Sequence, residues 1–327
     1  MFSNIKEKII SAIKLTEFGN RQFYLLKDKL GKNPIPDLEF PELLSLELSS
    51  ICNLTCIHCP SHNSEFAGVT RKHEHINYDL FMSLMDEIDL YGKRQIALHK
   101  DGEPLIHPRI VDILERVKKN VPHEVYLSTN GLTLNRKLCD LILANRIDIV
   151  NFSIGAGSGE FYEKVRGKGF HKLIKNVHDF LNMVSESKWK PKVIVQIIEL
   201  PEHQEMSKEI KAFKKYWKNF DVEIAVWKKL TWGVFENDGT FPYRYPCYSL
   251  WNSFNINSNG LVTACCIDWK QELVIGNVYN RRIKEIWSDE TLKELRLRHI
   301  NKEENEIDAC RTCNYWKWQP MLIEYPL

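Results

Sequence analysis

The sequence contains no long hydrophobic run and no dominant charge of either sign. Its first segment, MFSNIKEKIISAIKLTEF, carries Lys6, Glu7 and Lys8 inside the apolar pattern, so it fits neither a signal peptide nor a membrane-spanning helix. The 45 basic and 43 acidic residues leave a formal net charge of +2, which gives no reason to expect a nucleic-acid partner. We therefore expect a cytoplasmic protein with no integral membrane segment.

Low-complexity tracts are also missing, and 43% of the 327 residues are apolar, which is enough for a substantial core. A chain of this length favours one large domain with an appendage. We expect an N-terminal helical segment and linker over 1–42, a main domain over 43–235 and a smaller domain over 236–327. Turns and aromatic residues replace the earlier pattern in the last part.

The main domain alternates between strand-like and helix-like stretches. The strand-like runs lie at 43–49, 95–100, 124–130, 148–154, 192–200 and 222–228, with helical patterns between them, among others at 78–92, 108–120 and 171–186. Strands joined by crossover helices form a parallel sheet. Six such units are too few for a closed eightfold barrel, and no dinucleotide-binding glycine motif follows the first run. The fold class we predict is α/β, a partial (β/α)6 TIM-like barrel.

The last part of the chain reads as a small α+β domain. The stretch FNINSNGLVTACC predicts a β-hairpin with Asn259 and Gly260 at its turn, because Asn-Gly favours tight hairpin turns. A further strand-like run and a helix follow within 273–296.

Disulfides are not expected in a cytoplasmic chain, so the nine cysteines are first read as metal or redox ligands. Cys139 stands alone on the apolar face of an expected helix and is predicted to be a buried core thiol. The other eight form two groups, which are Cys52, Cys56 and Cys59 after the first strand, and Cys247, Cys265, Cys266, Cys310 and Cys313 near the C-terminal end.

The first group supplies three thiolates and lacks a fourth. Structural zinc takes four ligands, and His58 is badly placed to complete the set because it adjoins Cys59. An iron-sulfur cubane held by three thiolates would leave one iron exposed. Such an iron can bind a small chelating molecule.

The spacing C-x3-C-x2-C directly after the first strand, with His58 at the aromatic position before Cys59, resembles the radical S-adenosylmethionine (SAM) superfamily. The resemblance implies a 4Fe-4S cluster on Cys52, Cys56 and Cys59 whose free iron is chelated by SAM. One electron then cleaves SAM to methionine and a 5'-deoxyadenosyl radical, and that radical removes a hydrogen atom from an unactivated C–H bond.

Further segments at the strand ends carry the same resemblance. Gly102, Glu103 and Pro104 in LHKDGEPLIHP match the family's segment that holds the SAM ammonium, where a buried cation needs acceptors. The resemblance places His58 beside the cofactor as well. The remaining positions it assigns to SAM are Ser153 at the ribose, Arg166 at the carboxylate and Gln196 near the adenosine.

Two details qualify these assignments. The family often has Asp-Gly after its Ser-Ile, whereas Gly155 and Ala156 follow here, so the ribose contact of Ser153 is less certain than the others. A guanidinium suits the bidentate pairing that is expected of Arg166.

The second cysteine group resembles the SPASM/twitch extension of radical SAM enzymes, including the G-N-V and E-I-W landmarks in VIGNVYNRRIKEIW. Full SPASM domains have seven cysteines, and none follows Cys313 here. The resemblance therefore implies one auxiliary 4Fe-4S cluster on Cys247, Cys265, Cys310 and Cys313. Thiolate chemistry alone leaves zinc open at these four residues.

Cys266 is left without an assignment. It is either an inert neighbour, a replacement ligand, or a thiol that returns a hydrogen atom to a substrate radical, as radical epimerases require. Together with Lys100 and Lys228, which lie near strand ends, it is one of three candidates for a catalytic role. None of them can be assigned as the base from the sequence.

A single closed auxiliary cluster resembles the twitch-type dehydrogenases, so we expect oxidation of an alcohol of a sugar or aminocyclitol. The auxiliary cluster would take one electron, and a reduced flavodoxin or ferredoxin would be the external donor. Three alternatives stay open: modification of a ribosomal peptide, epimerisation using Cys266, and a non-enzymatic zinc-binding protein. The 42 residues before the first strand lack the strands of a peptide-recognition domain, which disfavours the first of these.

Overall fold

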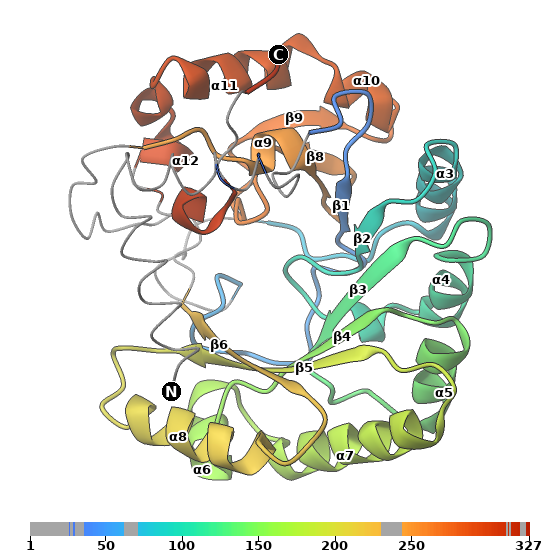
Figure 1. The fold of residues 1–327 in the computed structure, drawn as a ribbon, viewed down its shortest axis with the longest axis vertical. Coiled ribbons are helices and arrows are strands. Elements are labelled where there is room, and N and C mark those ends of the chain that lie inside the picture. The colour runs from blue at the N-terminus through green and yellow to red at the C-terminus, as the bar shows by residue number, and fades with distance from the viewer. Residues whose placement is uncertain are drawn as a thin grey trace.

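The protein is described from a computed structural model over residues 36–61, 71–229, 244–311, 313, 315–320 and 325–327, with residues 26 and 29 (Figure 1). Most of the expected N-terminal segment over 1–42 lies outside these ranges. The expected boundary after residue 235 lies outside them too, so the division into domains stays a prediction. No helix in the described ranges is long and apolar enough to cross a membrane.

A parallel sheet of six strands forms the main body. The strands are β1 (Leu43–Leu46), β2 (Gln95–Ala97), β3 (Glu124–Thr129), β4 (Ile149–Ser153), β5 (Lys192–Glu199) and β6 (Glu223–Lys228). They pair in chain order, each parallel to the next. All six predicted strands are confirmed, and the sheet curves without closing, as expected for a partial barrel.

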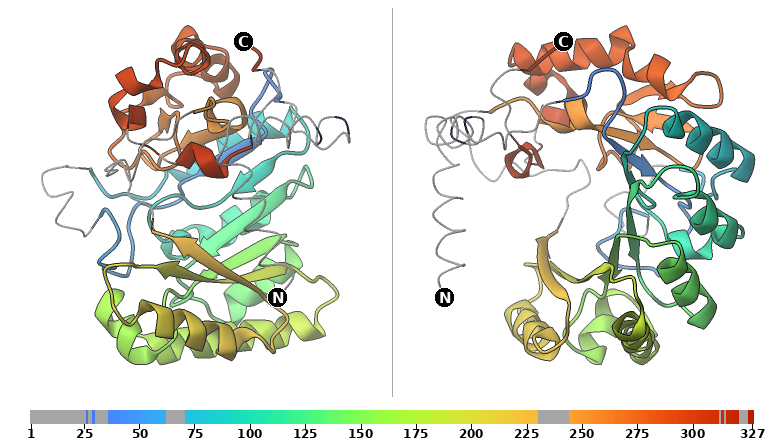
Figure 2. Two further views of the ribbon diagram at one scale, coloured as in Figure 1. Left: turned by 60° about the vertical axis from the view of Figure 1, so that its left-hand side comes forward. Right: turned by 45° about the vertical axis from the view of Figure 1, so that its right-hand side comes forward.

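Helices cover the convex face of this sheet (Figure 2). They are α3 (Tyr78–Asp89), α4 (Ile110–Arg116), α5 (Arg136–Ala144), α6 (Gly159–Val165), α7 (Phe170–Glu186) and α8 (Met206–Trp217). Alternate strand residues such as Val125 and Leu127 are fully buried, because one face of the sheet packs against these helices. Cys139 lies buried on α5, as predicted.

The C-terminal part continues the same sheet. β7 (Ser253–Ile256) pairs in parallel with β1, and β8 (Leu261–Thr263) and β9 (Val274–Asn277) follow in antiparallel pairing. The predicted hairpin is therefore confirmed, with Gly260 at a φ of +80° in its turn, a conformation that glycine adopts without strain. The nine strands run in the order β6-β5-β4-β3-β2-β1-β7-β8-β9.

Short helices complete this part. They are α9 (Ser249–Asn252), α10 (Ile283–Trp287), α11 (Glu290–Ile300) and α12 (Asp308–Arg311), and the 3-10 turn η4 (Tyr315–Trp318) follows them. The strand and helix expected within 273–296 are confirmed by β9, α10 and α11. In Figure 1 these elements lie above the open side of the curved sheet, next to β1.

Candidate active site

The first cysteine group lies in the loop that leaves β1, at the edge where parallel strands end. The backbone N–H of Ile57 donates to the carbonyl of Val165 at 3.0 Å, and that of Cys59 donates to the carbonyl of Cys56 at 3.1 Å. The loop is therefore fixed against the end of α6. Burial raises the pKa of Cys59 to about 11, so its thiol would be neutral until a metal displaces the proton.

His58 adjoins this group, but its imidazole carries no charge. Burial, together with the positive charge of Arg166, lowers the pKa of His58 to about 3. Its Nδ1 atom is buried and has no hydrogen-bond partner. A neutral ring in this position can pack against a bound cofactor without adding charge.

The loop after β2 packs directly on the end of β1. A Cβ atom at Gly102 would lie 2.3 Å from the carbonyl oxygen of Ser49 and 2.5 Å from that of Ile51, so only glycine fits. The backbone N–H of Glu103 donates to Ile51 at 2.9 Å. Since Ile51 precedes Cys52, this contact joins the predicted SAM-ammonium loop to the predicted cluster loop.

The carboxylate of Glu103 organises the next strand end. It accepts from the Thr129 hydroxyl at 2.6 Å, from the Asn130 backbone N–H at 2.7 Å and from the Leu105 backbone N–H at 3.0 Å. Pro104 begins the 3-10 turn η2 (Pro104–Ile106) that this last bond closes. Burial raises the pKa of Glu103 despite these donors. Glu103 therefore fixes the conformation of the loop, and its carboxylate can accept few further hydrogen bonds.

The three remaining positions predicted to hold SAM lie together at the ends of β4 and β5. The guanidinium of Arg166 donates to the Ser153 hydroxyl at 3.0 Å, and the backbone N–H of Gly155 donates to the carbonyl of Gln196 at 2.9 Å. A Cβ at Gly155 would come within 2.7 Å of Arg166. The departure Gly155-Ala156 thus makes room for this guanidinium.

Arg166 is 5% exposed, and its Nε has no partner. A buried cation with a free donor calls for an anion. The carboxylate of SAM meets that need, so this corner fits the cofactor that the sequence implied.

The second cysteine group lines one cavity. Cys247, Cys265, Cys310 and Cys313 are all among the residues that line it. Burial, aided by the neighbouring thiols, raises the pKa of Cys247 to about 11. The pKa of Cys310 is raised to about 12, again chiefly by burial. These thiols too would give up their protons on binding metal.

Thiolates bind zinc and iron-sulfur clusters alike, so the four cysteines suit either group by their chemistry alone. In the described ranges, no three His, Cys, Asp or Glu side chains form a group that could hold a single metal ion.

Backbone contacts hold the cavity walls in place. Arg244 donates to the carbonyl of Cys310 at 2.7 Å, and the Nδ1 atom of His299 accepts from the Cys247 backbone N–H at 3.4 Å. Cys266 does not line the cavity. The pKa of Cys266 is lowered to about 7 by a hydrogen bond with Cys265, and then by Tyr315 and the charge of Lys100.

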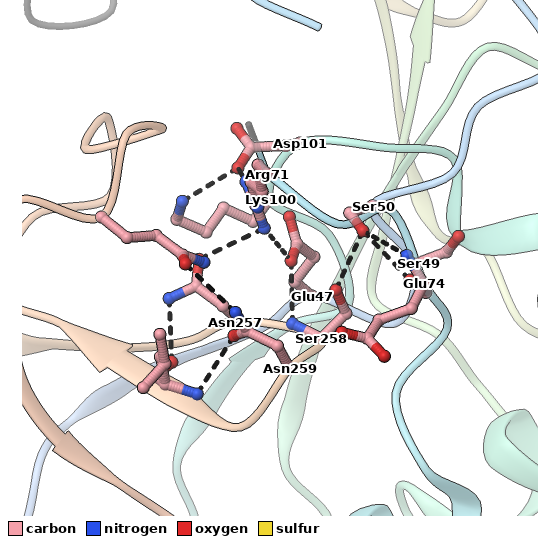
Figure 3. A network of polar contacts seen from close by, with 12 residues as sticks. Glu47, Ser49, Ser50, Arg71, Glu74, Lys100, Asp101, Asn257, Ser258 and Asn259 are labelled. Atoms are coloured by element: carbon pink, nitrogen blue, oxygen red, sulfur yellow. Dashed lines mark hydrogen bonds and ion pairs between the residues drawn. The ribbon is translucent and has the colours of Figure 1, made fainter. Parts of the chain in front are cut away.

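A buried polar network joins the segments that follow β1 and β2 to the turn between β7 and β8 (Figure 3). Arg71 donates to Glu47 and, at 2.6 Å, to Asp101. Lys100 donates to the same Asp101 oxygen at 2.9 Å, and the backbone N–H of Ser258 donates to Glu47 at 2.8 Å. All four charged side chains are at most 4% exposed.

The three predicted catalytic candidates differ in burial and in the groups that they contact. Burial alone would lower the pKa of Lys100, but Asp101 and Glu47 outweigh it and raise that pKa, so Lys100 is a buried cation and is poorly suited as a base. Lys228 is exposed at the end of β6. Cys266 stays beside Cys265, without a role that the contacts define.

Sequence reasoning missed Glu47 and Arg71. The signal for Glu47 was present, because it is the one charged residue in the apolar run LLSLELS, and a lone buried charge at a strand end marks a polar site. Arg71 carried no comparable signal, since its partners Glu47, Asp101 and Asn257 come from distant parts of the chain.

Two family models match the chain. The model described as the radical SAM superfamily matches residues 46–206, and the model described as the SPASM iron-sulfur cluster-binding domain matches residues 247–314. Between them they cover the strand ends that carry the first cysteine group and the cavity that carries the second.

Two curated relatives match parts of the chain. It is 32% identical over 113 residues to the tungsten-containing aldehyde ferredoxin oxidoreductase cofactor-modifying protein of Pyrococcus furiosus, covering 34% of this chain and 30% of the relative. It is 30% identical over 129 residues to the AdoMet-dependent heme synthase of Methanosarcina barkeri, covering 39% of this chain and 35% of the relative. The matched region spans about a third of the length of these relatives.

Three solved structures share the fold. BtrN in complex with AdoMet and 2-DOIA has a TM-score of 0.53 at 17% identity, covering 86% of this chain and 94% of that one. The structure of anSMEcpe with bound AdoMet has a TM-score of 0.58 at 15% identity, covering 84% of this chain and 86% of that one. Streptococcus suis SuiB bound to S-adenosylmethionine has a TM-score of 0.61 at 14% identity, covering 89% of this chain and 74% of that one. At these identities the likeness concerns the fold alone.

Proposed function

Because the chain belongs to the radical SAM superfamily and carries a C-terminal SPASM domain, we propose that it is an enzyme that dehydrogenates a secondary alcohol of a sugar or aminocyclitol. SAM, a SAM-binding 4Fe-4S cluster and an auxiliary iron-sulfur cluster are its cofactors. When bound, SAM and its cluster supply a radical able to take a hydrogen atom from an unactivated C–H bond. Cys52, Cys56 and Cys59 would hold that cluster.

The observation that carries this proposal is the cavity lined by Cys247, Cys265, Cys310 and Cys313. Four thiolates complete the coordination of a cubane cluster, so this site would exchange electrons and not chelate a substrate. An alcohol that becomes a carbonyl loses a hydrogen atom, a proton and one electron. Cys247, Cys265, Cys310 and Cys313 would hold the cluster that takes up this electron, and SAM with its own cluster would supply the radical for the hydrogen atom.

The proton requires an acceptor, and we assign that role to Glu47. One oxygen of its carboxylate is held by Arg71 and Ser258, while Oε1 is buried and without a partner. Burial, and then the nearby charge of Asp101, raises the pKa of Glu47, which makes it a stronger base. Lys100 and Arg71 are already protonated and cannot take the proton. Asp101 also has a buried oxygen without a partner, but Lys100 and Arg71 outweigh its burial and lower its pKa, which makes it a weaker base than Glu47.

Labelled substrates test the proposal. The anaerobically reconstituted enzyme is given SAM, dithionite and a panel of polyols, sugars and aminocyclitols deuterated at their secondary alcohol carbons. We expect deuterium in 5'-deoxyadenosine and one carbonyl product for each SAM consumed. The measurement is mass spectrometry of both products.

Other outcomes would replace the proposal with one of its alternatives. Transfer of deuterium from a labelled peptide would indicate a peptide-modifying enzyme. Inversion at carbon with uptake of solvent hydrogen, abolished in Cys266→Ala, would indicate an epimerase. A colourless, zinc-loaded protein after reconstitution with iron and sulfide would contradict an enzyme with iron-sulfur clusters.

A further inference from the structure

Lys100 connects the SAM side of the molecule with the auxiliary cavity. It follows β2 and stands two residues before Gly102, in the loop that packs on the end of β1. Its ammonium group donates to Asp101 at 2.9 Å and, across the junction, to the backbone carbonyl of Asp268 at 3.3 Å. Asp268 is three residues after the cavity cysteine Cys265.

The loop that receives this bond is tightly closed. The Asp268 carboxylate accepts from the backbone N–H groups of Glu272 at 3.0 Å and Leu273 at 2.8 Å, and the Asp268 backbone N–H donates to the carbonyl of Cys265 at 3.3 Å. A cation fixed to the Asp268 carbonyl is therefore fixed relative to the cysteine loop. Lys100 is 2% exposed, so water screens its charge little.

A second cation, Arg244, contacts the opposite wall through the carbonyl of Cys310 at 2.7 Å. It also lies 3.7 Å from Glu304, which offsets part of its charge. Lys270 lines the same cavity but is 27% exposed and pairs with Glu272 at 3.6 Å. Of these three cations, Lys100 is the most deeply buried and comes from the SAM side.

We propose that Lys100 is a positioning residue that raises the reduction potential of the auxiliary cluster. A cluster held by four thiolates becomes more negative when it accepts an electron, and a buried positive charge stabilises the reduced form more than the oxidised one. The alcohol is oxidised to the carbonyl, and its last electron reduces the auxiliary site by one electron. The purpose of a raised potential rests on the proposed function, but the potential itself can be measured without a substrate.

The test is a redox titration followed by electron paramagnetic resonance. Cys52, Cys56 and Cys59 are replaced by alanine in the full chain, so that the signal comes from the auxiliary cluster alone. Lys100→Met should shift the midpoint potential to more negative values, and Lys100→Arg should hold it near the parent value. Lys270→Met is the matched control, and its shift should be small because solvent already screens that charge.

The Asp101→Asn substitution should shift the midpoint potential in the direction opposite to Lys100→Met. It removes a carboxylate that offsets Lys100, so the potential should become more positive. Loosened packing would not produce opposite shifts in the two variants. If Lys100→Met fails to bind iron, Lys100→Gln takes its place, because an amide removes the charge and keeps a donor for Asp101 and Asp268. Unchanged potentials, or shifts of the same sign, would overturn the proposal.

The result is separable from the proposed function. Opposite shifts together with failure of every alcohol in the labelled panel would reject dehydrogenation and leave the role of Lys100 at the cluster standing. Alcohol oxidation with unchanged potentials would reject the role of Lys100 alone.

Discussion

At the scale of single residues, one substitution tests the proposed role of Glu47 as the proton acceptor. Glu47→Gln should keep the oxygen that accepts from Arg71 and Ser258, while an amide nitrogen replaces the free Oε1. We expect carbonyl formation to fall by about 10²-fold, the usual contribution of a positioned base. SAM cleavage should continue, and chromatography of 5'-deoxyadenosine and carbonyl product measures the two separately.

The control for Glu47 is Glu74, which joins the network of Figure 3 through its backbone and not through its carboxylate. Glu74 pairs its side chain with the exposed Lys72 at 2.8 Å, so Glu74→Gln should leave both products near parent levels. Carbonyl formation at the parent rate in Glu47→Gln would show that another group takes the proton.

His99 makes stability depend on pH. It is partly buried against Tyr126, and burial lowers its pKa to about 4, whereas the unfolded chain has a histidine pKa of about 6.5. The unfolded state therefore binds the proton first as pH falls. Stability is complete above the unfolded pKa and is lost as pH falls through the folded one, by about 2 kcal/mol between pH 7 and pH 5.

Urea unfolding at the two pH values checks this dependence. His99→Gln should reduce the difference by about 2 kcal/mol, because no titrating ring remains at that position. His58 and His299, whose pKa values burial lowers to about 3, should still contribute the rest. His171 is exposed, and His171→Gln should retain the parent difference. An equal difference in parent and His99→Gln would rule out His99 as its source.

The same residues mark what the sequence could predict. The local spacing of Cys52, Cys56 and Cys59 predicted a cluster site, whereas Cys247, Cys265, Cys310 and Cys313 were assigned through a family resemblance, and both ligand sets stay predictions. The polar network could not be predicted from local spacing, because Arg71 lies 24 positions from Glu47 and 186 positions from Asn257 along the sequence. Such partners depend on the sheet that brings them together, and assignment of the individual SAM contacts stays a prediction.

At the scale of elements, the loop after β2 must approach the end of β1 closely. Gly102→Ala would place a Cβ within 2.3 Å of Ser49 and 2.5 Å of Ile51, both at backbone oxygens that cannot rotate away. We expect SAM binding to weaken by at least about tenfold, the equivalent of 1.4 kcal/mol. Equilibrium dialysis of labelled SAM with the reconstituted enzyme measures it.

Gly92→Ala serves as the comparison for this loop. Gly92 has a φ of +75°, and no atom lies within 4 Å of a Cβ built there. The substitution should cost about 1 kcal/mol of stability through its left-handed backbone and leave SAM binding unchanged. Parent-like binding by Gly102→Ala would mean that the close approach does not shape the SAM site.

Element types were predictable because each depends on a local pattern. Alternating apolar residues gave the strands, and Asn259-Gly260 indicated the hairpin turn. The pairing of β7 with β1 was not predicted, because it joins residues such as Leu44 and Phe254 without any local pattern that names the partner. Parallel pairing of this kind is a property of the assembled sheet.

At the scale of the whole molecule, one nine-stranded sheet runs through both the SAM part and the auxiliary part, which predicts that they unfold together. β1 pairs with β2 on one side and with β7 on the other, so damage to β7 should reach the barrel. Phe254 is fully buried in β7 and packs near Trp287. Phe254→Ala should cost about 3–5 kcal/mol.

Peptide-resolved hydrogen exchange measures how far along the sheet the loss of stability in Phe254→Ala extends. In Phe254→Ala we expect faster exchange in β7 to β9 and also in β1 and β2, because the shared ladder opens from one side. Val274→Ala at the exposed start of β9 should change β9 alone. Faster exchange confined to residues 244–311 would show two independent units. Spread into β1 would mean that the cavity for the auxiliary cluster and the loop for the SAM cluster keep their spacing because a single sheet carries both.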